Sequence, residues 1–488
     1  MRRTLSLGLT AAAIAVVAVP GTSAAETQSA KTPSTVRWGE CPEDSALPGL
    51  ECSVLDVPLD YRHPERKTIE VAISRLASTK PEKRRGVLFT NPGGPGGAGL
   101  NYPALLKLVG LPQSVLDSYD VIGFDPRGVG HSTPVTCDLT PEQQARGNFP
   151  KQPDTLADVA KEATYAKTVA EQCATSKTAS LLPHTTTANT ARDMDRIRAA
   201  LGEPKISYDG ASYGSYLGAV YTTMFPRHSD RIVLDSNLGP GGYDATAMRM
   251  FAHGLQDRFP DFAKFAAEHP EYGLGTTPAQ VTAKYYELAA RLDRKPVREV
   301  DGTLFRGATF GSLYTEAGLT ELAELWKALD TDTPLPAQPP AQPWENIENL
   351  SSVRLAVICG DSRWPRSVRT YQRHVAVDRL RYPMLGAVTA NIGPCAYWPT
   401  SPVEPQVRIG DRGPSNILMV QNERDPGTPL VGARELRQAF GKRATMVTAD
   451  EGGHGVYPFG KNECAKDAVT RFLTTGERPS RDRACAAE

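Results

Sequence analysis

Three features are missing from this sequence, and each absence excludes a class of protein. The chain has no excess of charge, because 55 lysines and arginines balance 55 aspartates and glutamates, whereas a nucleic-acid protein would show a basic patch or tail. It has no repeat of fixed period and no long low-complexity tract. After residue 25 it has no apolar run of the ~20 residues that span a membrane. We therefore expect a compact globular monomer without nucleic-acid partners or a membrane span in the mature protein.

Metal-binding spacing is also missing. The eight cysteines form no C-x-x-C pair and have no zinc-ligand spacing with histidines, so we expect no metal and no cofactor. An even cysteine count in an oxidising compartment predicts disulfides, although eight cysteines allow 105 pairings. Short loops favour pairing between neighbours in the sequence. The expected pairs are Cys41–Cys52, Cys137–Cys173, Cys359–Cys395 and Cys464–Cys485.

The segment 1–25 has the pattern of a secretory signal peptide. Arg2 and Arg3 precede an apolar, alanine-rich run over 5–19, and small side chains lead up to Ala24 and Ala25. A membrane anchor is the alternative, but the run is short for a span. We expect cleavage near Ala24 or Ala25 and a secreted, extracellular protein.

Strand and helix patterns alternate along the remaining chain. Strand-like segments lie at 50–61, 68–78, 85–94, 119–128, 205–212, 231–236, 416–425 and 444–450. Helix-like segments lie at 189–201, with Asn189 as its expected cap, and at 213–225, 431–440 and 463–473. This alternation predicts an α/β fold with a mostly parallel sheet and helices on both faces, opened by an antiparallel pair.

The middle of the chain interrupts the alternation. From about residue 240 to 400 helical signals and loops predominate, with a proline-rich segment at 331–343. We expect a first core part over 36–240, a mainly helical cap insertion over 241–400, and a second core part over 401–488.

A serine stands between two glycines where the expected strand 205–212 meets the expected helix 213–225. Gly210-Ala211-Ser212-Tyr213-Gly214 fits G-x-S-x-G, a pattern that is weak by itself. A preceding strand and a following helix are the context that a nucleophile elbow requires. This context favours Ser212 as a nucleophile and the Tyr213 N–H as an oxyanion donor over an ordinary Gly/Ser loop.

A serine nucleophile needs a base, and in this architecture the acid and then the histidine follow the serine in the chain. Asp425 ends one expected strand, and His454 lies in the loop after the next. The interval between them has room for one helix and one strand, so both loops fall at the same sheet edge as Ser212. A turn aspartate and a surface histidine are the alternatives, and Glu423 is the nearest competing acid.

The segment 85–94 is a short apolar strand that runs into a loop, and this loop is the glycine run "NPGGPGGAG" at 91–99. Gly93 and Gly94 have no side chains to block a carbonyl oxygen, so the second oxyanion donor is expected there rather than a plain turn. In the next loop, Asp125 and Arg127 are expected to pair with each other as scaffold.

These motifs together resemble a known family. The segments "NPGGPGG", "GFDPRGVGHS", "TTTANTARDMDRIRAALGE", "GASYGSYLGAVY", "CGDSRWP", "NERDPGTP" and "GGHGV" are similar to those of α/β-hydrolase peptidases related to proline iminopeptidase. The similarity is greatest to the secreted tripeptidyl aminopeptidases of Streptomyces type. It implies the α/β-hydrolase fold, with Ser212 as nucleophile, Asp425 as acid and His454 as base. Intracellular proline iminopeptidases usually have histidine before the glycine run, whereas this chain has Pro92, which favours the tripeptidyl branch.

The resemblance also implies that the cap recognises the free amino terminus of a peptide or protein substrate. An ammonium in a dry pocket needs a paired charge. The candidate acids, which the sequence does not separate, are Asp361, Glu316, Glu321 and Glu345. The expected function is a serine exopeptidase that releases tripeptides, and the alternatives are a prolyl aminopeptidase or a secreted esterase or amide hydrolase with the same triad. A non-catalytic binding protein would usually lack one of the three residues.

Overall fold

The computed structural model describes residues 36–147, 149–337 and 342–488, which belong to one compact unit. The expected signal peptide at 1–25 lies outside these ranges, as do residues 338–341 of the proline-rich segment. Within the described ranges no helix combines the length and the hydropathy needed to cross a bilayer.

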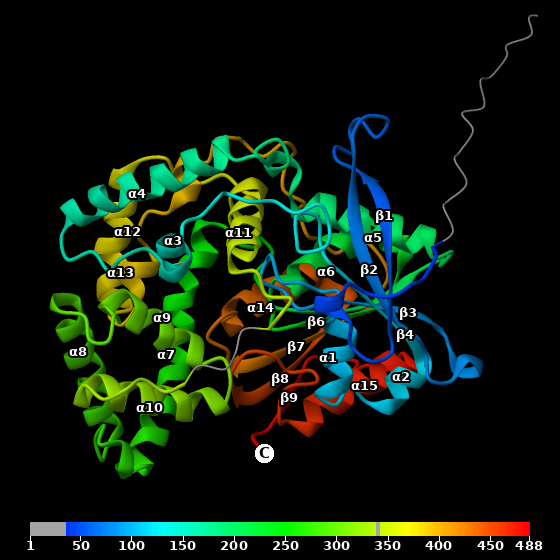
Figure 1. Ribbon diagram of the computed structural model, residues 1–488. Helices are drawn as coiled ribbons and strands as arrows, with labels where there is room; N and C mark the ends of the chain where they lie inside the picture. The colour runs from blue at the N-terminus through cyan, green and yellow to red at the C-terminus, as the bar shows by residue number, and fades with distance from the viewer. Residues whose placement is uncertain (1–35, 148, 338–341) are drawn as a thin grey trace, which may run out of the picture. The chain divides into compact units, whose positions relative to one another are not determined.

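A nine-stranded sheet forms the centre of the described chain (Figure 1). Its strands are β1 (Leu50–Pro58), β2 (Thr68–Leu76), β3 (Gly86–Asn91), β4 (Tyr119–Phe124), β5 (Ile206–Ala211), β6 (Ser229–Asp235), β7 (Ile417–Arg424), β8 (Ala444–Gly452) and β9 (Arg483–Cys485). Their order is β1-β2-β4-β3-β5-β6-β7-β8-β9. Strands β1, β2 and β4 pair antiparallel, and all other pairs are parallel. The predicted opening hairpin and parallel sheet are confirmed, and β9 is a strand that the sequence pattern does not reveal.

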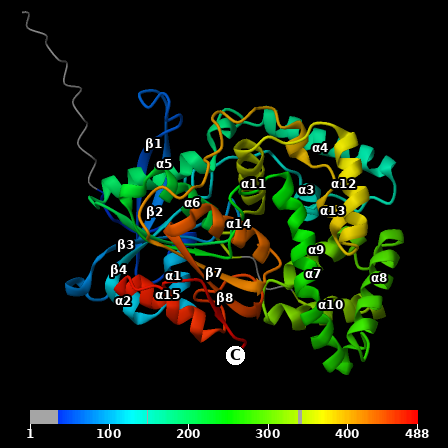
Figure 2. The same cartoon turned by 180° about the vertical axis from the view of Figure 1, so that it is seen from behind.

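Helices cover both faces of the sheet (Figure 1, Figure 2). One face carries α1 (Tyr102–Leu108), α2 (Gln113–Ser118) and α15 (Glu463–Thr475), and the other carries α5 (Thr187–Ala200), α6 (Tyr213–Met224) and α14 (Leu430–Phe440). Strands β3 and β4 are buried at every position because helices cover both of their sides. Apolar residues of such strands need no alternation, which explains the short continuous runs in the sequence.

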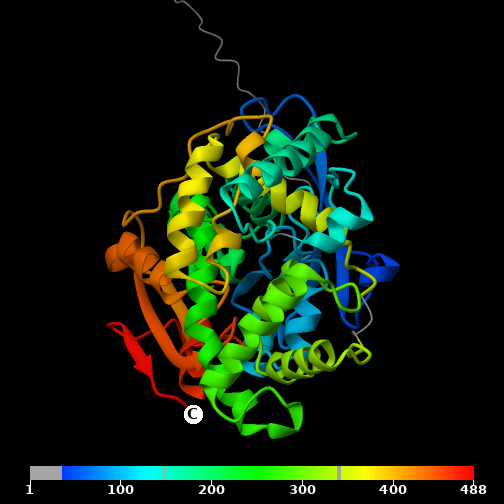
Figure 3. The same ribbon diagram turned by 90° about the vertical axis from the view of Figure 1, so that its left-hand side faces the viewer.

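A group of helices separates β6 from β7 in the chain and lies beside the carboxyl ends of the strands (Figure 1). They are α7 (Ala245–Glu268), α8 (Pro278–Arg294), α9 (Gly302–Ser312), α10 (Ala317–Thr331), α11 (Ile347–Asp361), α12 (Val368–Arg381) and α13 (Gly386–Thr389). Helices α3 (Pro141–Arg146) and α4 (Leu156–Thr175), from the connection between β4 and α5, pack against α11 and α12 respectively (Figure 3). We call these nine helices the cap; the exact domain boundaries stay a prediction.

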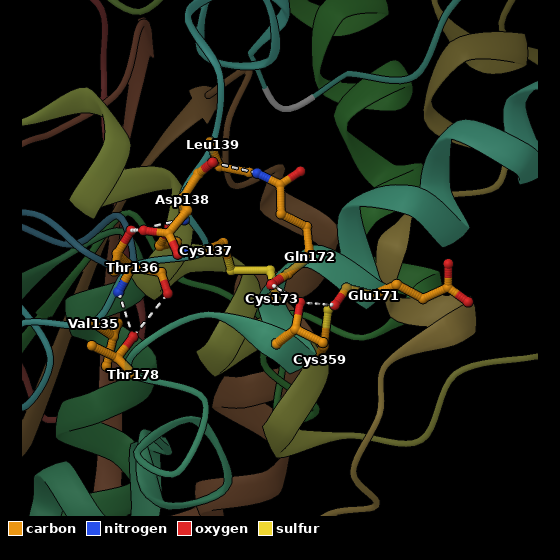
Figure 4. The surroundings of a disulfide bond; sticks show 12 residues. Val135, Thr136, Cys137, Asp138, Leu139, Glu171, Gln172, Cys173, Thr178 and Cys359 are labelled. Carbon is orange, nitrogen blue, oxygen red and sulfur yellow. Dashed lines mark hydrogen bonds between the residues drawn. A yellow bond between two sulfur atoms is a disulfide. The ribbon is translucent and has the colours of Figure 1, made fainter.

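All four expected disulfides are present: Cys41–Cys52, Cys137–Cys173, Cys359–Cys395 and Cys464–Cys485. Figure 4 shows that Cys137–Cys173 joins the loop after β4 to α4, with Cys359 of α11 beside it. Next to this bridge, the Thr178 hydroxyl donates to the carbonyl of Thr136 and accepts the Thr136 N–H, both at 2.8 Å. Two of the bridges therefore meet where the cap contacts the core.

The expected pairing of Asp125 with Arg127 is wrong. Arg127 makes a buried, bidentate ion pair with Asp193 of α5, with N–O distances of 2.6 and 2.7 Å. Asp125 instead accepts the backbone N–H groups of Gly99 and Leu100, at 2.8 and 3.0 Å. Both charges do serve as scaffold, but the loop turns their side chains toward different neighbours. Asp125 thereby anchors the end of the glycine run.

Candidate active site

Ser212 occupies a sharp turn between β5 and α6. Its φ of +60° and ψ of −125° are unusual for a residue with a side chain. Such strain persists where the surrounding structure fixes the backbone, and it is often found at functional sites. The two flanking glycines have separate packing reasons: a Cβ on Gly210 would lie 2.4 Å from the Tyr208 hydroxyl, and one on Gly214 would lie 2.7 Å from the Asn91 carbonyl.

Asp425 begins the tight turn Asp-Pro-Gly-Thr after β7 and is fully buried. Its Oδ1 accepts the backbone N–H groups of Gly427 and Thr428, at 2.8 and 2.9 Å, and its Oδ2 accepts the Thr428 hydroxyl at 2.8 Å. Three donors therefore satisfy the carboxylate and fix its plane. The competing acid Glu423 accepts a hydrogen bond from Thr448 instead.

His454 lies in the loop after β8, with Nδ1 2.9 Å from each carboxylate oxygen of Asp425. Because an ionised carboxylate only accepts hydrogen bonds, Nδ1 carries the proton and Nε2 is left as an acceptor. The backbone N–H of His454 donates to the Tyr314 carbonyl at 2.7 Å, and the Tyr314 ring centroid lies 4.7 Å from the centroid of the imidazole ring. Backbone and ring contacts thus fix the orientation of the imidazole.

A second buried carboxylate holds the His454 loop. Asp235, at the end of β6, accepts the N–H groups of Val456 and Tyr457, and burial raises its pKa to about 6. Burial by itself lowers the pKa of His454, but the negative charges of Asp425 and Asp235 outweigh burial, so the pKa of His454 is raised. The protonated form of His454 is therefore stabilised, as a residue that accepts a proton requires.

The glycine run lies against the Ser212 turn. A Cβ on Gly93 would lie 2.7 Å from the Ala211 carbonyl and 2.8 Å from the Ser212 Cβ, so only glycine fits there. The Gly93 N–H donates to the Asn91 side chain at 3.0 Å. Within the described residues the Gly94 N–H has no hydrogen-bond acceptor. Of the two expected glycine donors, Gly94 is thus the one whose N–H is available, together with that of Tyr213.

Comparison with known proteins identifies the family. Residues 382–485 match the family model described as TAP-like protein. The chain is 37% identical to the tripeptidyl aminopeptidase of Streptomyces lividans over 92% of this chain and 86% of that one. The chain belongs to the tripeptidyl aminopeptidase family. It is also 28% identical to the serine protease Hip1 of Mycobacterium tuberculosis, over 92% of this chain and 91% of that one. A protein named carboxylesterase B from the same species is 30% identical over 99% of this chain and 97% of that one.

This membership confirms the α/β-hydrolase fold and a serine hydrolase of the peptidase type. Among solved structures, a proline iminopeptidase of Mycobacterium smegmatis covers 86% of this chain and 97% of its own, with 15% identity and a TM-score of 0.38. The family assignment rests on the sequence relatives.

In this family member a cavity of about 120 Å³ lies within the cap. Apolar residues predominate in its wall, and the wall also contains Arg354 of α11 and the ion pair of Arg146 with Glu162. The Arg354 guanidinium donates to the Gly94 carbonyl at 3.4 Å and lies 5.7 Å from the ring centroid of Tyr243. Burial raises the pKa of Tyr243, and both Arg354 and the Ser212 hydroxyl act to lower it. Arg354 thus connects the cavity with the surroundings of Ser212.

The four candidate acids for an amino terminus lie apart in the structure. Asp361 accepts two hydrogen bonds from Thr187, and burial raises its pKa to about 6. Glu316 pairs with Arg258, Glu345 accepts the Gln342 N–H, and Glu321 is exposed. None of these four is in the wall of the cap cavity, where the acid is Glu162. Sequence reasoning missed Glu162 because α4 precedes the segment expected to form the cap.

Other neighbours of the site also escaped the sequence analysis. The sequence does indicate a role for Thr428, because in a turn such as Asp-Pro-Gly-Thr the aspartate side chain commonly accepts the N–H groups of the residues that follow it. No sequence pattern indicates Tyr314 or Arg354, because their contacts with His454 and Gly94 join parts of the chain that are distant in sequence.

Proposed function

We propose that the protein is a serine exopeptidase with Ser212 as nucleophile, His454 as base and Asp425 as acid. The observation that carries the proposal is the 2.9 Å contact of Asp425 with His454 Nδ1 at the sheet edge where Ser212 occupies a strained turn. Two of its relatives have names that describe peptidases, which supports a peptide as the substrate.

In the proposed mechanism His454 Nε2 takes the proton of the Ser212 hydroxyl as its oxygen attacks the scissile carbonyl. Asp425 keeps the imidazole in the required tautomer and stabilises the imidazolium. The Gly94 and Tyr213 N–H groups stabilise the negative oxygen of the tetrahedral intermediate. The carbon–nitrogen bond then breaks, the leaving amine takes the proton from His454, and an acyl-enzyme ester forms. Water, deprotonated by His454, hydrolyses that ester and restores Ser212.

We propose further that the released product is a tripeptide from a free amino terminus. The name of the Streptomyces lividans relative supports this length. The cap cavity, connected to the surroundings of Ser212 by Arg354, offers a mostly apolar space for a short acyl segment. An extended tripeptide spans only about 10 Å, so this proposal requires a binding space of about that length between Ser212 and the end of the acyl part.

Two measurements test the proposal. Ser212→Ala should abolish turnover of a tripeptide p-nitroanilide and labelling by a fluorophosphonate, and retained activity would remove Ser212 from the mechanism. Mass spectrometry of products from matched peptides with free and acetylated amino termini should show tripeptides from the free series alone. Equal cleavage of the acetylated series would reject the exopeptidase proposal.

A second candidate is a secreted esterase with the same triad, which the carboxylesterase B relative favours. Parallel assays with p-nitrophenyl esters of fatty acids and with tripeptide p-nitroanilides separate the two. A kcat/KM that is higher for the tripeptide amide than for any ester supports the peptidase, because amides are intrinsically the more difficult substrates.

We also propose that the protein is exported and loses the segment 1–25. The four disulfides support this location, because such bonds persist in oxidising compartments. Amino-terminal sequencing of the protein from culture medium should begin near residue 25 or 26, and recovery of the intact chain inside cells alone would contradict export.

A further inference from the structure

Helix α11 of the cap contacts the glycine run and also the start of α5. Leu350, Arg354 and Asp361 follow one another at spacings of four and seven positions along it. At 100° per residue these spacings place all three within about 40° of one another around the helix axis. Arg354 and Asp361 therefore direct their side chains to the same side of the helix, and Leu350 makes its contact there through its backbone carbonyl.

The first contact joins α11 to the glycine run by close packing. A Cβ on Gly96 would lie 2.6 Å from the Leu350 carbonyl oxygen, a separation that real side chains do not adopt. The Gly96 φ of +96° also disfavours other residues. Gly96 is therefore a site where the backbone of α11 and the backbone of the loop approach each other directly.

The second contact fixes the loop at the expected oxyanion donor. Arg354 Nη1 donates to the Gly94 carbonyl at 3.4 Å, which is long for a hydrogen bond but is strengthened by the charge of the donor. Holding this carbonyl restricts rotation about the Gly94 backbone, whose φ of +111° would otherwise be loosely specified. The Gly94 N–H lies in the preceding peptide plane and is joined to this carbonyl through the Gly94 Cα, so the contact limits how far the loop that contains the N–H can move.

The third contact reaches the other expected donor. Asp361 Oδ1 accepts the Thr187 N–H at 2.9 Å, and Asp361 Oδ2 accepts the Thr187 hydroxyl at 2.5 Å. The same hydroxyl lies 2.6 Å from the Tyr213 hydroxyl. Since the Thr187 proton is donated to the carboxylate, the Tyr213 hydroxyl donates to Thr187. Tyr213 is thus held at its side chain, while its backbone N–H starts α6 beside Ser212.

The helix is itself fixed on the core. The Asn349 side chain donates to the carbonyls of Gly128 and Val135, each at 2.8 Å, and accepts the Gly130 N–H at 2.9 Å. A rigid support is what pre-organised oxyanion donors require, because their effect depends on placement before the reaction begins.

We propose that α11 is the positioning element of the oxyanion hole: Arg354 holds Gly94, and Asp361 holds Tyr213 through Thr187. Neither side chain touches the reacting atoms. The inference rests on the proposed serine-hydrolase mechanism but not on the identity of the acyl group. It makes the cap part of the catalytic machinery, in addition to forming the substrate cavity.

The test uses Arg354→Met and Tyr213→Phe, which remove one contact each and leave the backbone donors in place. Arg363→Met is the matched control, because Arg363 is exposed and lies just beyond the end of α11. We expect kcat to fall about 10-fold to 100-fold in the two variants and to be unchanged in the control, since small misplacements of catalytic groups have effects of this size.

The readouts separate positioning from substrate binding. The KM for a tripeptide p-nitroanilide should change less than about 2-fold, and the inhibition constant of a tripeptide aldehyde should rise by the factor by which kcat/KM falls, because its hemiacetal oxygen occupies the oxyanion hole. An unchanged kcat, or a raised KM at constant kcat, would overturn the proposal. If Arg354→Met does not fold, Tyr213→Phe and Arg354→Lys decide the outcome by the same criteria.

The hydrolysis of p-nitrophenyl acetate keeps this test independent of the proposed substrate. Acetate esters need the oxyanion hole but no amino-terminal recognition. If the wild-type protein hydrolyses the acetate but no tripeptide amide, the peptidase proposal fails and the positioning proposal is still judged on acetate turnover. Loss of acetate turnover in Arg354→Met but not in Arg363→Met supports the positioning proposal.

Discussion

Asp425 combines a structural role with the catalytic role that we propose for it. Its Oδ1 accepts two backbone N–H groups of the turn that follows it, and both carboxylate oxygens contact His454 Nδ1. The sequence alternatives of a turn aspartate and a catalytic acid are therefore compatible in one residue. A residue that organises its own turn is already oriented when the imidazole becomes charged.

Replacing Asp425 with Asn keeps the shape but removes the charge and places a donor group beside His454. We expect kcat to fall about 10⁴-fold, because the imidazole is then held in the wrong tautomer. Steady-state kinetics with a tripeptide p-nitroanilide measure this. A decrease in kcat of less than about 10-fold would show that Asp425 has no part in orienting His454.

The pH dependence of kcat/KM tests the charge environment of His454. The pKa of this imidazole is raised above 6.5 by Asp425 and Asp235 against the effect of burial. Because the base must be neutral, activity should be lost as the pH falls through a midpoint above 6.5. In Asp425→Asn the residual activity should show a lower midpoint, since one negative charge is gone. An unmoved midpoint would assign the acid limb to another group, such as Asp235.

Among the elements, the glycine run after β3 is shaped by what approaches it rather than by flexibility. Gly93 faces the Ser212 turn, Gly96 faces the backbone of α11, and a Cβ on Gly99 would lie 2.2 Å from the Phe124 carbonyl. Three different neighbours thus require glycine at three positions. The sequence indicates a ligand approach there, but only part of the run lies beside Ser212.

Gly96→Ala should reduce kcat about 10-fold or more, because the new methyl group collides with the Leu350 carbonyl and displaces the loop. Gly110→Ala is the matched control: its φ of +99° is nearly the same as the +96° of Gly96, but no atom lies within 4 Å of its Cβ. Both variants have similar backbone strain, so Gly110→Ala measures the effect of strain alone. Gly96→Ala should lower the unfolding temperature further because of the collision, and kcat should fall in Gly96→Ala alone. Equal kcat losses would assign the effect to strain.

Sequence patterns locate most elements of the core but not all of their ends. They predict Asn189 as the cap of a helix over 189–201, whereas α5 begins at Thr187 and the Thr186 hydroxyl accepts the Asn189 N–H. The threonines at 185–187 offer several possible caps; Thr186 caps α5, and Thr187 contacts Asp361. The site residues that sequence spacing suggests lie at strand ends, where topology fixes position, while Arg354 and Glu162 depend on how helices pack.

At the scale of the whole molecule, one disulfide joins the cap to the loop after β4, and a second lies beside it within the cap. Cys137–Cys173 ties the β4 loop to α4, and Cys359–Cys395 ties α11 to the segment after α13. The segment expected to form the cap begins at residue 241, so no sequence pattern assigns 137–175 to it. The helices against which this stretch packs come much later in the chain, and only the tertiary structure brings them together.

Removing the Cys137–Cys173 bridge with a double serine substitution should lower the free energy of unfolding by roughly 2–4 kcal/mol. Removing Cys41–Cys52, whose cysteines are separated by 11 rather than 36 positions, should cost less. Urea denaturation followed by fluorescence measures both. The variant without Cys137–Cys173 should also have a lower kcat, because α11 lies beside that bridge. A larger loss of kcat in the variant without Cys41–Cys52 would contradict this prediction.

The order of the disulfides along the chain has a consequence for biosynthesis. The four loops, 41–52, 137–173, 359–395 and 464–485, neither overlap nor enclose one another. If the chain emerges amino terminus first and unfolded, as the proposed export allows, each cysteine meets its partner before any cysteine of the next pair appears. Oxidation in order of emergence would then produce the native set without an isomerase that reshuffles wrong pairs.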